Sequence, residues 1–158
     1  MDAAAVAFLA LWILSREAAS LFGALRRRRS NRQMLRLLNT QKPVTPEEFF
    51  RMREAGAGRE NAKEGKAFEQ KGVYVLTNTN SQKKYVGQGI RVGDRIARHF
   101  TGKGNEGVYR DYRKGDRFLI RTAALSDTGF RSLNEMERCA IASFKAFQKG
   151  YNKTRGNR

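Results

Sequence analysis

Apolar residues are unevenly distributed along the chain, and their spacing changes twice. Residues 3–14 form an unbroken apolar run, and residues 30–70 are mostly polar. From residue 71 onward, short apolar runs alternate with glycine-containing turns, a pattern typical of short strands and helices. The pattern divides the chain into an apolar and basic N-terminal helix (1–30), a polar helical linker region (31–70) and a small folded domain (71–158).

The pattern within residues 71–158 predicts an α+β domain. Apolar runs on either side of the polar turn TNTNSQKK favour a β-hairpin with a long loop. The spacing predicts a short helix over 92–100, a short helix or turn over 108–115 and a third strand over 117–125. A last helix begins at Ser132, with Glu135 completing a capping box, and runs to about Lys149. These elements predict one antiparallel sheet with helices around it.

The polar region before this domain contains one clear helix start. Thr45 is a good N-cap, Pro46 occupies the first helical position and Glu48 completes a capping box. The stretch GAGRENAKEGK, residues 55–65, combines glycine with many charges and is typical of a linker. We therefore expect the domain boundary near it.

Residues 3–25 are a candidate membrane segment. The apolar run of twelve is shorter than the ~20 residues that span a bilayer, and a longer segment must include Arg16 and Glu17. The four arginines at 26–29 are typical of the cytoplasmic flank of a membrane helix, and they also suit an interfacial helix on anionic lipid. Packing on a partner is the alternative. We expect a cytoplasmic protein, with anchoring at the cytoplasmic face of the membrane left open.

The formal net charge is +17, which favours a polyanionic partner. Residues 71–158 contain 19 basic and 7 acidic residues, a net charge of +12, spread through the folded part rather than gathered in a tail. Nucleic acid and an anionic membrane surface are the two candidate partners. The alternative is that the surplus charge only maintains solubility. No protein partner is identifiable from the sequence.

The counts of cysteine and histidine limit the chemistry. Cys139 is the single cysteine, so a disulfide framework is excluded and a reducing compartment fits. His99 is the single histidine, so the chain cannot build a Cys/His zinc site. A metal ion would have to be held by oxygen ligands and water, which favours Mg²⁺ or Mn²⁺.

Two tyrosines of the predicted hairpin form the first candidate site. Side chains alternate along a strand, so Tyr74 shares a face with Gly72, and Tyr85 shares one with Gly87. Both tyrosines can then project on the same side, although ordinary packing of strand aromatics is the alternative. In the helix that follows, Arg95 and His99 lie four residues apart and can meet a phosphate together.

Glu137 is the most informative single residue of the last predicted helix. It lies four residues after Leu133 and four before Ile141, inside the apolar stripe of that helix. Burial of a carboxylate without a partner is costly. Glu137 is therefore either a metal ligand or one half of a buried ion pair with an arginine.

In combination these residues resemble the GIY-YIG nuclease superfamily. Its GIY element corresponds to residues 72–74 (GVY), and its YIG element to residues 85–87 (YVG). The family arginine, ten residues beyond the second tyrosine, corresponds to Arg95. A histidine four residues further, found in several branches of the family, corresponds to His99.

The last two elements of the resemblance lie near the C-terminal end. The family glutamate on a late helix corresponds to Glu137, and the closing asparagine corresponds to Asn152 of Gly150-Tyr151-Asn152. The resemblance covers residues 71–158. Valine replaces isoleucine twice, and Gln88 stands where a small hydroxyl residue is common.

The resemblance implies a GIY-YIG-like three-stranded antiparallel sheet flanked by helices, and an endonuclease that hydrolyses phosphodiester bonds of DNA with one divalent ion, Mg²⁺ or Mn²⁺. It implies Tyr74 as general base, Arg95 as the group that stabilises phosphate charge, and Glu137 as the metal ligand. We expect Tyr85 to orient water or phosphate, His99 to assist proton transfer and Asn152 to hold local structure.

A basic surface is expected to bind the DNA backbone without reading sequence. Its members are Lys83, Lys84, Arg91, Arg98, Arg110, Arg113 and Arg117. RNA as the substrate is not excluded. The alternatives are a nucleic-acid-binding module with weak or no nuclease activity, and an adaptor that uses its charge at a membrane surface.

Overall fold

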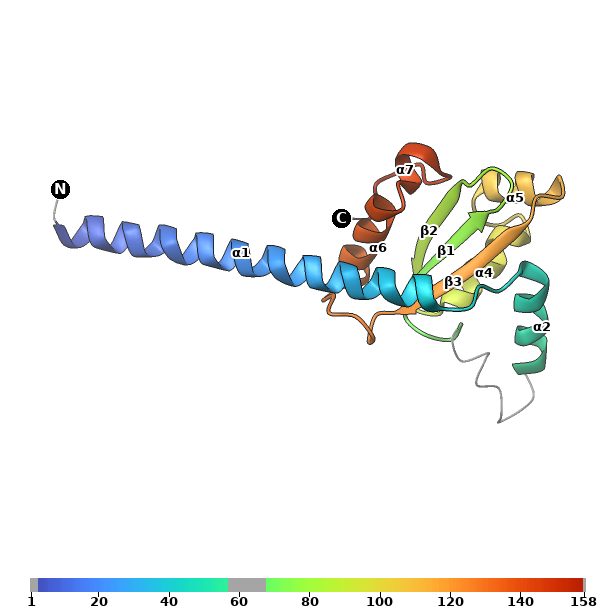
Figure 1. The fold of residues 1–158 in the computed structure, drawn as a ribbon, viewed down its shortest axis with the longest axis horizontal. Coiled ribbons are helices and arrows are strands. Elements are labelled where there is room, and N and C mark those ends of the chain that lie inside the picture. The colour runs from blue at the N-terminus through green and yellow to red at the C-terminus, as the bar shows by residue number, and fades with distance from the viewer. Residues whose placement is uncertain (1–2, 57–67, 158) are drawn as a thin grey trace.

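The structure is a computed structural model that describes residues 3–56 and 68–157, with side chains from Phe8 onward. Three antiparallel strands form one sheet in the order β2-β1-β3, with β1 at Gly72–Asn78, β2 at Lys84–Gly89 and β3 at Phe118–Ala124. The central strand β1 pairs with both others, and β2 is an edge strand. The expected α+β fold, with a three-stranded antiparallel sheet flanked by helices, is confirmed (Figure 1).

Helices cover both faces of the sheet, because both faces of β1 carry apolar side chains. On one face, Val73 and Val75 pack with residues of α1 (Ala3–Thr40), α6 (Leu133–Ser143) and α7 (Ala146–Lys149). On the other face, Tyr74 and Leu76 pack with residues of α2 (Pro46–Gly56), α4 (Val92–Phe100) and α5 (Glu106–Arg113). The sheet is therefore the middle of three layers, with a separate hydrophobic core on each side.

The expected polar helical linker region, 31–70, is helical at residues 31–40 and 46–56 and non-helical at 41–45 and 68–70, and both of its helices contribute to the cores. The side chains of Met34, Leu38 and Phe49 are fully buried in the two cores. Val44 also exchanges two backbone hydrogen bonds with Ile120 of β3. The few apolar residues in this polar stretch are spaced to face the sheet, so polar composition was a poor guide to their burial. The predicted boundary at 55–65 lies mostly outside the described residues.

The predicted helix starts are confirmed in outline. The Thr45 hydroxyl accepts a hydrogen bond from the Glu48 N–H, and the Glu48 carboxylate accepts one from the Thr45 N–H, which completes the capping box. At the start of α6, the Ser132 hydroxyl accepts from the Glu135 N–H. The Glu135 carboxylate, however, accepts from the Arg131 N–H. The second box is therefore only half formed.

The predicted helix from Ser132 to Lys149 is broken in the structure. It ends at Ser143, and Lys145 adopts a left-handed φ of 52° before the short helix α7. The break redirects the chain toward β2, where the Tyr151 N–H donates to the Lys84 carbonyl. A Cβ at position 150 would overlap that same carbonyl, so the close approach requires Gly150.

Candidate active site

Tyr74 and Tyr85 lie on the same face of the hairpin, as the alternation predicted. Tyr74 is directly opposite Gly87, Tyr85 is opposite Leu76, and the centroids of the two tyrosine rings are 6.1 Å apart. Tyr74 is almost fully buried, and its ring crosses over Gly87. A Cβ at position 87 would overlap the Tyr74 hydroxyl. The glycine of YVG therefore makes room for the tyrosine of GVY.

His99 joins this pair from helix α4. Its Nε2 lies 2.8 Å from the Tyr74 hydroxyl, and its ring centroid is 4.4 Å from that of Tyr85. The backbone N–H of Asn105 donates to His99 Nδ1 at 2.8 Å. An N–H can only donate, so Nδ1 carries a lone pair and the proton of the neutral ring is on Nε2. His99 therefore donates a hydrogen bond to Tyr74, and it is not placed to accept the Tyr74 proton.

Burial determines the protonation states of His99 and Tyr74. It lowers the pKa of His99 to about 4, with the positive charges of Arg95 and Arg98 acting in the same direction, so the imidazole is neutral at pH 7. Burial also raises the pKa of Tyr74 well above its usual value, and the nearby Tyr85 adds to this rise. Arg95 lowers the pKa of Tyr74 but does not outweigh burial. At neutral pH, Tyr74 is consequently a phenol, and the lowered pKa expected for a general base is not observed in this state.

Arg95 occupies the exposed face of α4, one turn before His99. The exposed guanidinium borders a depression of about 280 Å³ that is also lined by Tyr85, His99 and Lys103. The side-chain stem of Arg95 lies close to Gly89, where a Cβ would approach its Cγ to 2.9 Å. The predicted pairing of Arg95 with His99 beside the hairpin is thus observed, next to an open space of suitable charge for a phosphate.

Glu137 reaches the site from the opposite face of the sheet. The residue is 8% exposed, and its Oε2 accepts hydrogen bonds from Gln88 Nε2 at 3.1 Å and from the Asn157 N–H at 3.2 Å. The ion pairs found among residues 3–56 and 68–157 do not include Glu137. The alternative of a buried ion pair with an arginine is therefore not what the structure shows. Neutral amides satisfy this carboxylate.

The two groups of candidate residues come together at edge strand β2. Tyr74, Tyr85 and Arg95 belong to the face covered by α4, whereas Gln88 and Glu137 belong to the face covered by α6. The negative charge of Glu137 is close enough to contribute to the raised pKa of both tyrosines. An edge strand has no further strand beside it, so groups from both faces can reach one substrate there.

Among the described residues, Glu137 is the candidate carboxylate ligand for a metal ion. The described residues contain no cluster of three or more His, Cys, Asp or Glu side chains suited to a metal. Mg²⁺ commonly takes one or two carboxylates and completes its shell with water and substrate phosphate oxygens. Both described hydrogen bonds of Glu137 end on Oε2, so the carboxylate that would hold a cation is kept in one orientation. Glu137 therefore fits a magnesium or manganese site that substrate helps to complete.

Asn152 secures strand β2 at the middle residue of YVG. Its Oδ1 accepts from the Val86 N–H and its Nδ2 donates to the Val86 carbonyl, both at 2.8 Å. This pair of bonds replaces the missing neighbour strand at that position of the edge. Asn152 is therefore positioned as a structural residue of the site, beside the chemistry rather than in it.

The seven predicted DNA-contacting residues are not equivalent. Lys83, Arg98, Arg113 and Arg117 are exposed, and Lys84 is half-buried. Arg91 and Arg110 are exposed too, but both are already engaged in ion pairs, Arg91 with Glu69 and Asp94, and Arg110 with Asp111. Their charge is partly compensated, which weakens their contribution to binding of a polyanion.

Two residues of the site were missed by sequence reasoning. Gln88 holds the Glu137 carboxylate, and its position on the same face as Val86, among apolar residues, was the available signal. Asn105 fixes the His99 tautomer through its backbone, and no side-chain pattern indicates such a contact. Its side chain has a separate role as the N-cap of α5.

Comparison with known proteins gives one match. Residues 70–152 match the family model described as the GIY-YIG catalytic domain. No match was found among the curated proteins or the solved structures. The matched range begins just before β1 and ends at Asn152, so it contains all six candidate catalytic residues.

Proposed function

The chain belongs to the GIY-YIG family, and from this membership and the geometry of the site we propose that it is a metal-dependent endonuclease that hydrolyses phosphodiester bonds of DNA. Family membership supports a nuclease-type fold that acts on nucleic acid in general. The observation that carries the proposal is the meeting of two tyrosines, an exposed guanidinium and a buried carboxylate at one edge strand.

Arg95 is assigned to the phosphate. Its exposed guanidinium borders the depression beside Tyr85 and His99, and a planar cation there matches the oxygens of a phosphodiester. Negative charge grows on these oxygens as water attacks phosphorus. A fixed positive charge at that place lowers the barrier, because it is already oriented before the reaction.

Tyr74 is assigned as the general base toward the attacking water, a role that requires the phenolate. The His99 Nε2–H donates to the Tyr74 oxygen and so stabilises its charged form, and Arg95 acts in the same direction. Burial opposes both, so the phenolate is a minor form at neutral pH and the rate should rise as the pH is raised. Tyr85, which lines the depression, would orient water or phosphate.

Glu137 is assigned to the divalent cation. When bound, such an ion supplies charge neutralisation at a non-bridging phosphate oxygen and at the leaving oxygen. Gln88 and Asn157 hold the Glu137 carboxylate in one orientation through Oε2. The exposed basic residues would bind the DNA backbone through charge, with little dependence on sequence.

Nicking of supercoiled plasmid by the full chain tests the proposal. The wild-type chain should nick DNA with Mg²⁺ or Mn²⁺ and should not do so with chelator. Glu137→Gln should lower the rate by about 100-fold or more, because the amide keeps the volume but loses the charge. The matched control is Glu54→Gln, an exposed glutamate of α2 away from the site, which should nick at the wild-type rate.

Two results would count against the proposal. A wild-type chain that binds DNA but never cuts it would favour a binding module, a reading to which the protonated Tyr74 gives some support. Cleavage that persists in Glu137→Gln would show that Glu137 is not the ligand of the cation.

A further inference from the structure

Helix α1 has no protein packed against it from Phe8 to Phe22, the part of its first half whose side chains are described. The helix is continuous from Ala3 to Thr40, and its N-terminal half projects beyond the rest of the molecule (Figure 1). Eight of its large apolar side chains are more than half exposed. They are Phe8, Leu9, Leu11, Trp12, Leu14, Leu21, Phe22 and Leu25. So many bare apolar side chains on one segment mark a surface that is covered by something else.

The distribution of these side chains indicates what covers them. Residues 11–14 are four consecutive large apolar residues, and at 100° per residue they point to all sides of the helix. A helix that is apolar all round belongs inside a protein or a membrane, whereas a docking helix needs only one apolar stripe. Residues 3–25 measure about 34 Å along the axis, close to the ~30 Å of a bilayer core.

The charges along this segment also fit lipid. Residues 26–29 are four arginines directly after the apolar segment, and those at 27–29 are exposed, where anionic headgroups would lie. Residues 3–25 contain two charged residues, Arg16 and Glu17. The Arg16 guanidinium lies over the Trp12 ring, 4.5 Å from its centroid.

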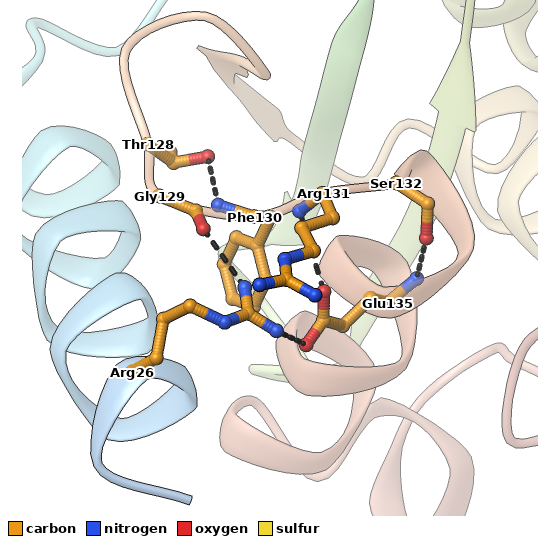
Figure 2. A network of polar contacts seen from close by, with 7 residues as sticks. All are labelled: Arg26, Thr128, Gly129, Phe130, Arg131, Ser132 and Glu135. Atoms are coloured by element: carbon orange, nitrogen blue, oxygen red, sulfur yellow. Dashed lines mark hydrogen bonds and ion pairs between the residues drawn. The ribbon is translucent and has the colours of Figure 1, made fainter. Parts of the chain in front are cut away.

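Helix α1 makes hydrogen bonds to the catalytic domain immediately after the apolar segment. Figure 2 shows Arg26 donating to the Gly129 carbonyl and to Glu135 Oε1, both at 3.1 Å. We call this pair of contacts the clasp. One turn later, Ser30 is buried beside Gly129, and Met34 and Leu38 continue into the core. No flexible linker separates the apolar segment from the fold, and Glu135 is two residues from Glu137 on α6.

We propose that residues 3–25 insert into a lipid bilayer, and that the clasp and the continuous helix α1 hold the catalytic domain at the surface of that bilayer. The arginines at 26–29 place the domain on the cytoplasmic side. The active site is then carried at a fixed distance from the membrane, since the rigid helix, rather than a tether, connects the two. This inference does not depend on nuclease activity.

The single tryptophan of the chain, Trp12, lies inside the segment and reports on its surroundings. Full chain is mixed with vesicles of zwitterionic and anionic phospholipid and floated on a density gradient, and Trp12 fluorescence is read with lipids brominated on their acyl chains. The proposal predicts that the protein floats, stays with the vesicles in high salt and shows strong quenching of Trp12 by the bromines.

Two outcomes would overturn it. A soluble oligomer that does not float, with Trp12 unquenched, would mean that a second copy covers α1. Release by high salt with Trp12 unquenched would mean that only surface charge holds the protein to lipid.

Two variants distinguish bilayer insertion from nonspecific hydrophobic adsorption to vesicles. Leu11→Lys combined with Leu14→Lys should lower the ratio of bound to free protein by about 100-fold or more, because each lysine must enter the apolar core. Neither residue contacts the catalytic domain, so circular dichroism should show an unchanged fold. The matched control is Ile90→Lys, an apolar residue that is 75% exposed outside α1, which should float like the wild type. Equal flotation of all variants would contradict the proposal.

Discussion

The His99 imidazole links the electrostatics of the site to the stability of the fold. It is buried and neutral, with a pKa of about 4 against 6.5 for an unperturbed histidine. Between these two values the unfolded chain binds a proton that the folded chain does not. Proton binding by the unfolded chain therefore lowers the free energy of unfolding as the pH falls from 6.5 toward 4. Above pH 6.5 this loss of stability is absent.

The pH dependence of unfolding measures this link. Between pH 6.5 and 4 the wild type should lose about 3 kcal/mol more stability than His99→Gln, which keeps hydrogen-bonding groups but does not titrate. Urea unfolding at a series of pH values gives the two free energies of unfolding. Carboxylates that titrate in the same range affect both proteins equally, so their effect cancels in the difference. Parallel curves for the two proteins would show that His99 is not buried as a neutral group.

The positions of Tyr74, Tyr85, Arg95 and His99 could be predicted because they depend on local geometry. Alternation along a strand and the four-residue spacing of a helix decide which side chains face one another. The contact of Gln88 with Glu137 could not be predicted in this way, since it joins residues 49 apart in sequence across a strand and a helix. The direction of the Tyr74 pKa was also missed, because it depends on burial by several elements at once.

At the scale of elements, the contact between α1 and α6 decides how the N-terminal helix relates to the site. The clasp joins Arg26 to Glu135, whose side chains are 31% and 15% exposed. Ion pairs in such partly shielded positions are stronger than those in water, where most contribute little. Because α6 also carries Glu137, the clasp braces the helix that positions the candidate metal ligand.

A double-mutant cycle measures the clasp. Arg26→Ala and Glu135→Ala should show a coupling free energy of about 1 kcal/mol in urea unfolding. The control cycle uses Arg91 and Glu69, a pair that is 57% and 55% exposed and should couple by less than about 0.5 kcal/mol. Equal coupling in the two cycles would mean that α1 is not fastened to α6 through this pair.

Most elements could be predicted from the sequence, but their ends and partners less well. The two N-caps at Thr45 and Ser132 are confirmed because a cap depends on neighbouring residues only. The break after Ser143 was missed because no glycine or proline marks it and Lys145 takes the left-handed conformation. Tertiary contacts of the 150–152 segment with β2 accompany this break.

At the scale of the whole molecule, the folded unit is larger than the 71–158 region of the family resemblance. Helices α1 and α2 supply Met34, Leu38 and Phe49 to the two cores. A sequence-based boundary near residues 55–65 rested on composition, and composition does not report which of a few apolar residues in a polar stretch are buried.

Two fragments test the extent of the folded unit. A fragment of residues 26–158 keeps the clasp and the buried side chains of Met34 and Leu38, whereas residues 41–158 lose both side chains. Since removal of one such side chain costs about 2–5 kcal/mol, the shorter fragment should be destabilised by about 4 kcal/mol or more. Small domains are stable by only about 5–15 kcal/mol, so its urea midpoint should be much lower, or absent. Equal midpoints would show that α1 is dispensable for folding.

The central claim is that this chain cuts DNA through the oxygen of Tyr74, and the plasmid-nicking rate of Tyr74→Phe in the full chain tests it most directly. The phenylalanine ring can still lie over Gly87, so the substitution removes the reacting oxygen while the packing is kept. With Mg²⁺ or Mn²⁺ present, the account predicts a rate at least about 100-fold below that of the wild type. Nicking by Tyr74→Phe at the wild-type rate would contradict it.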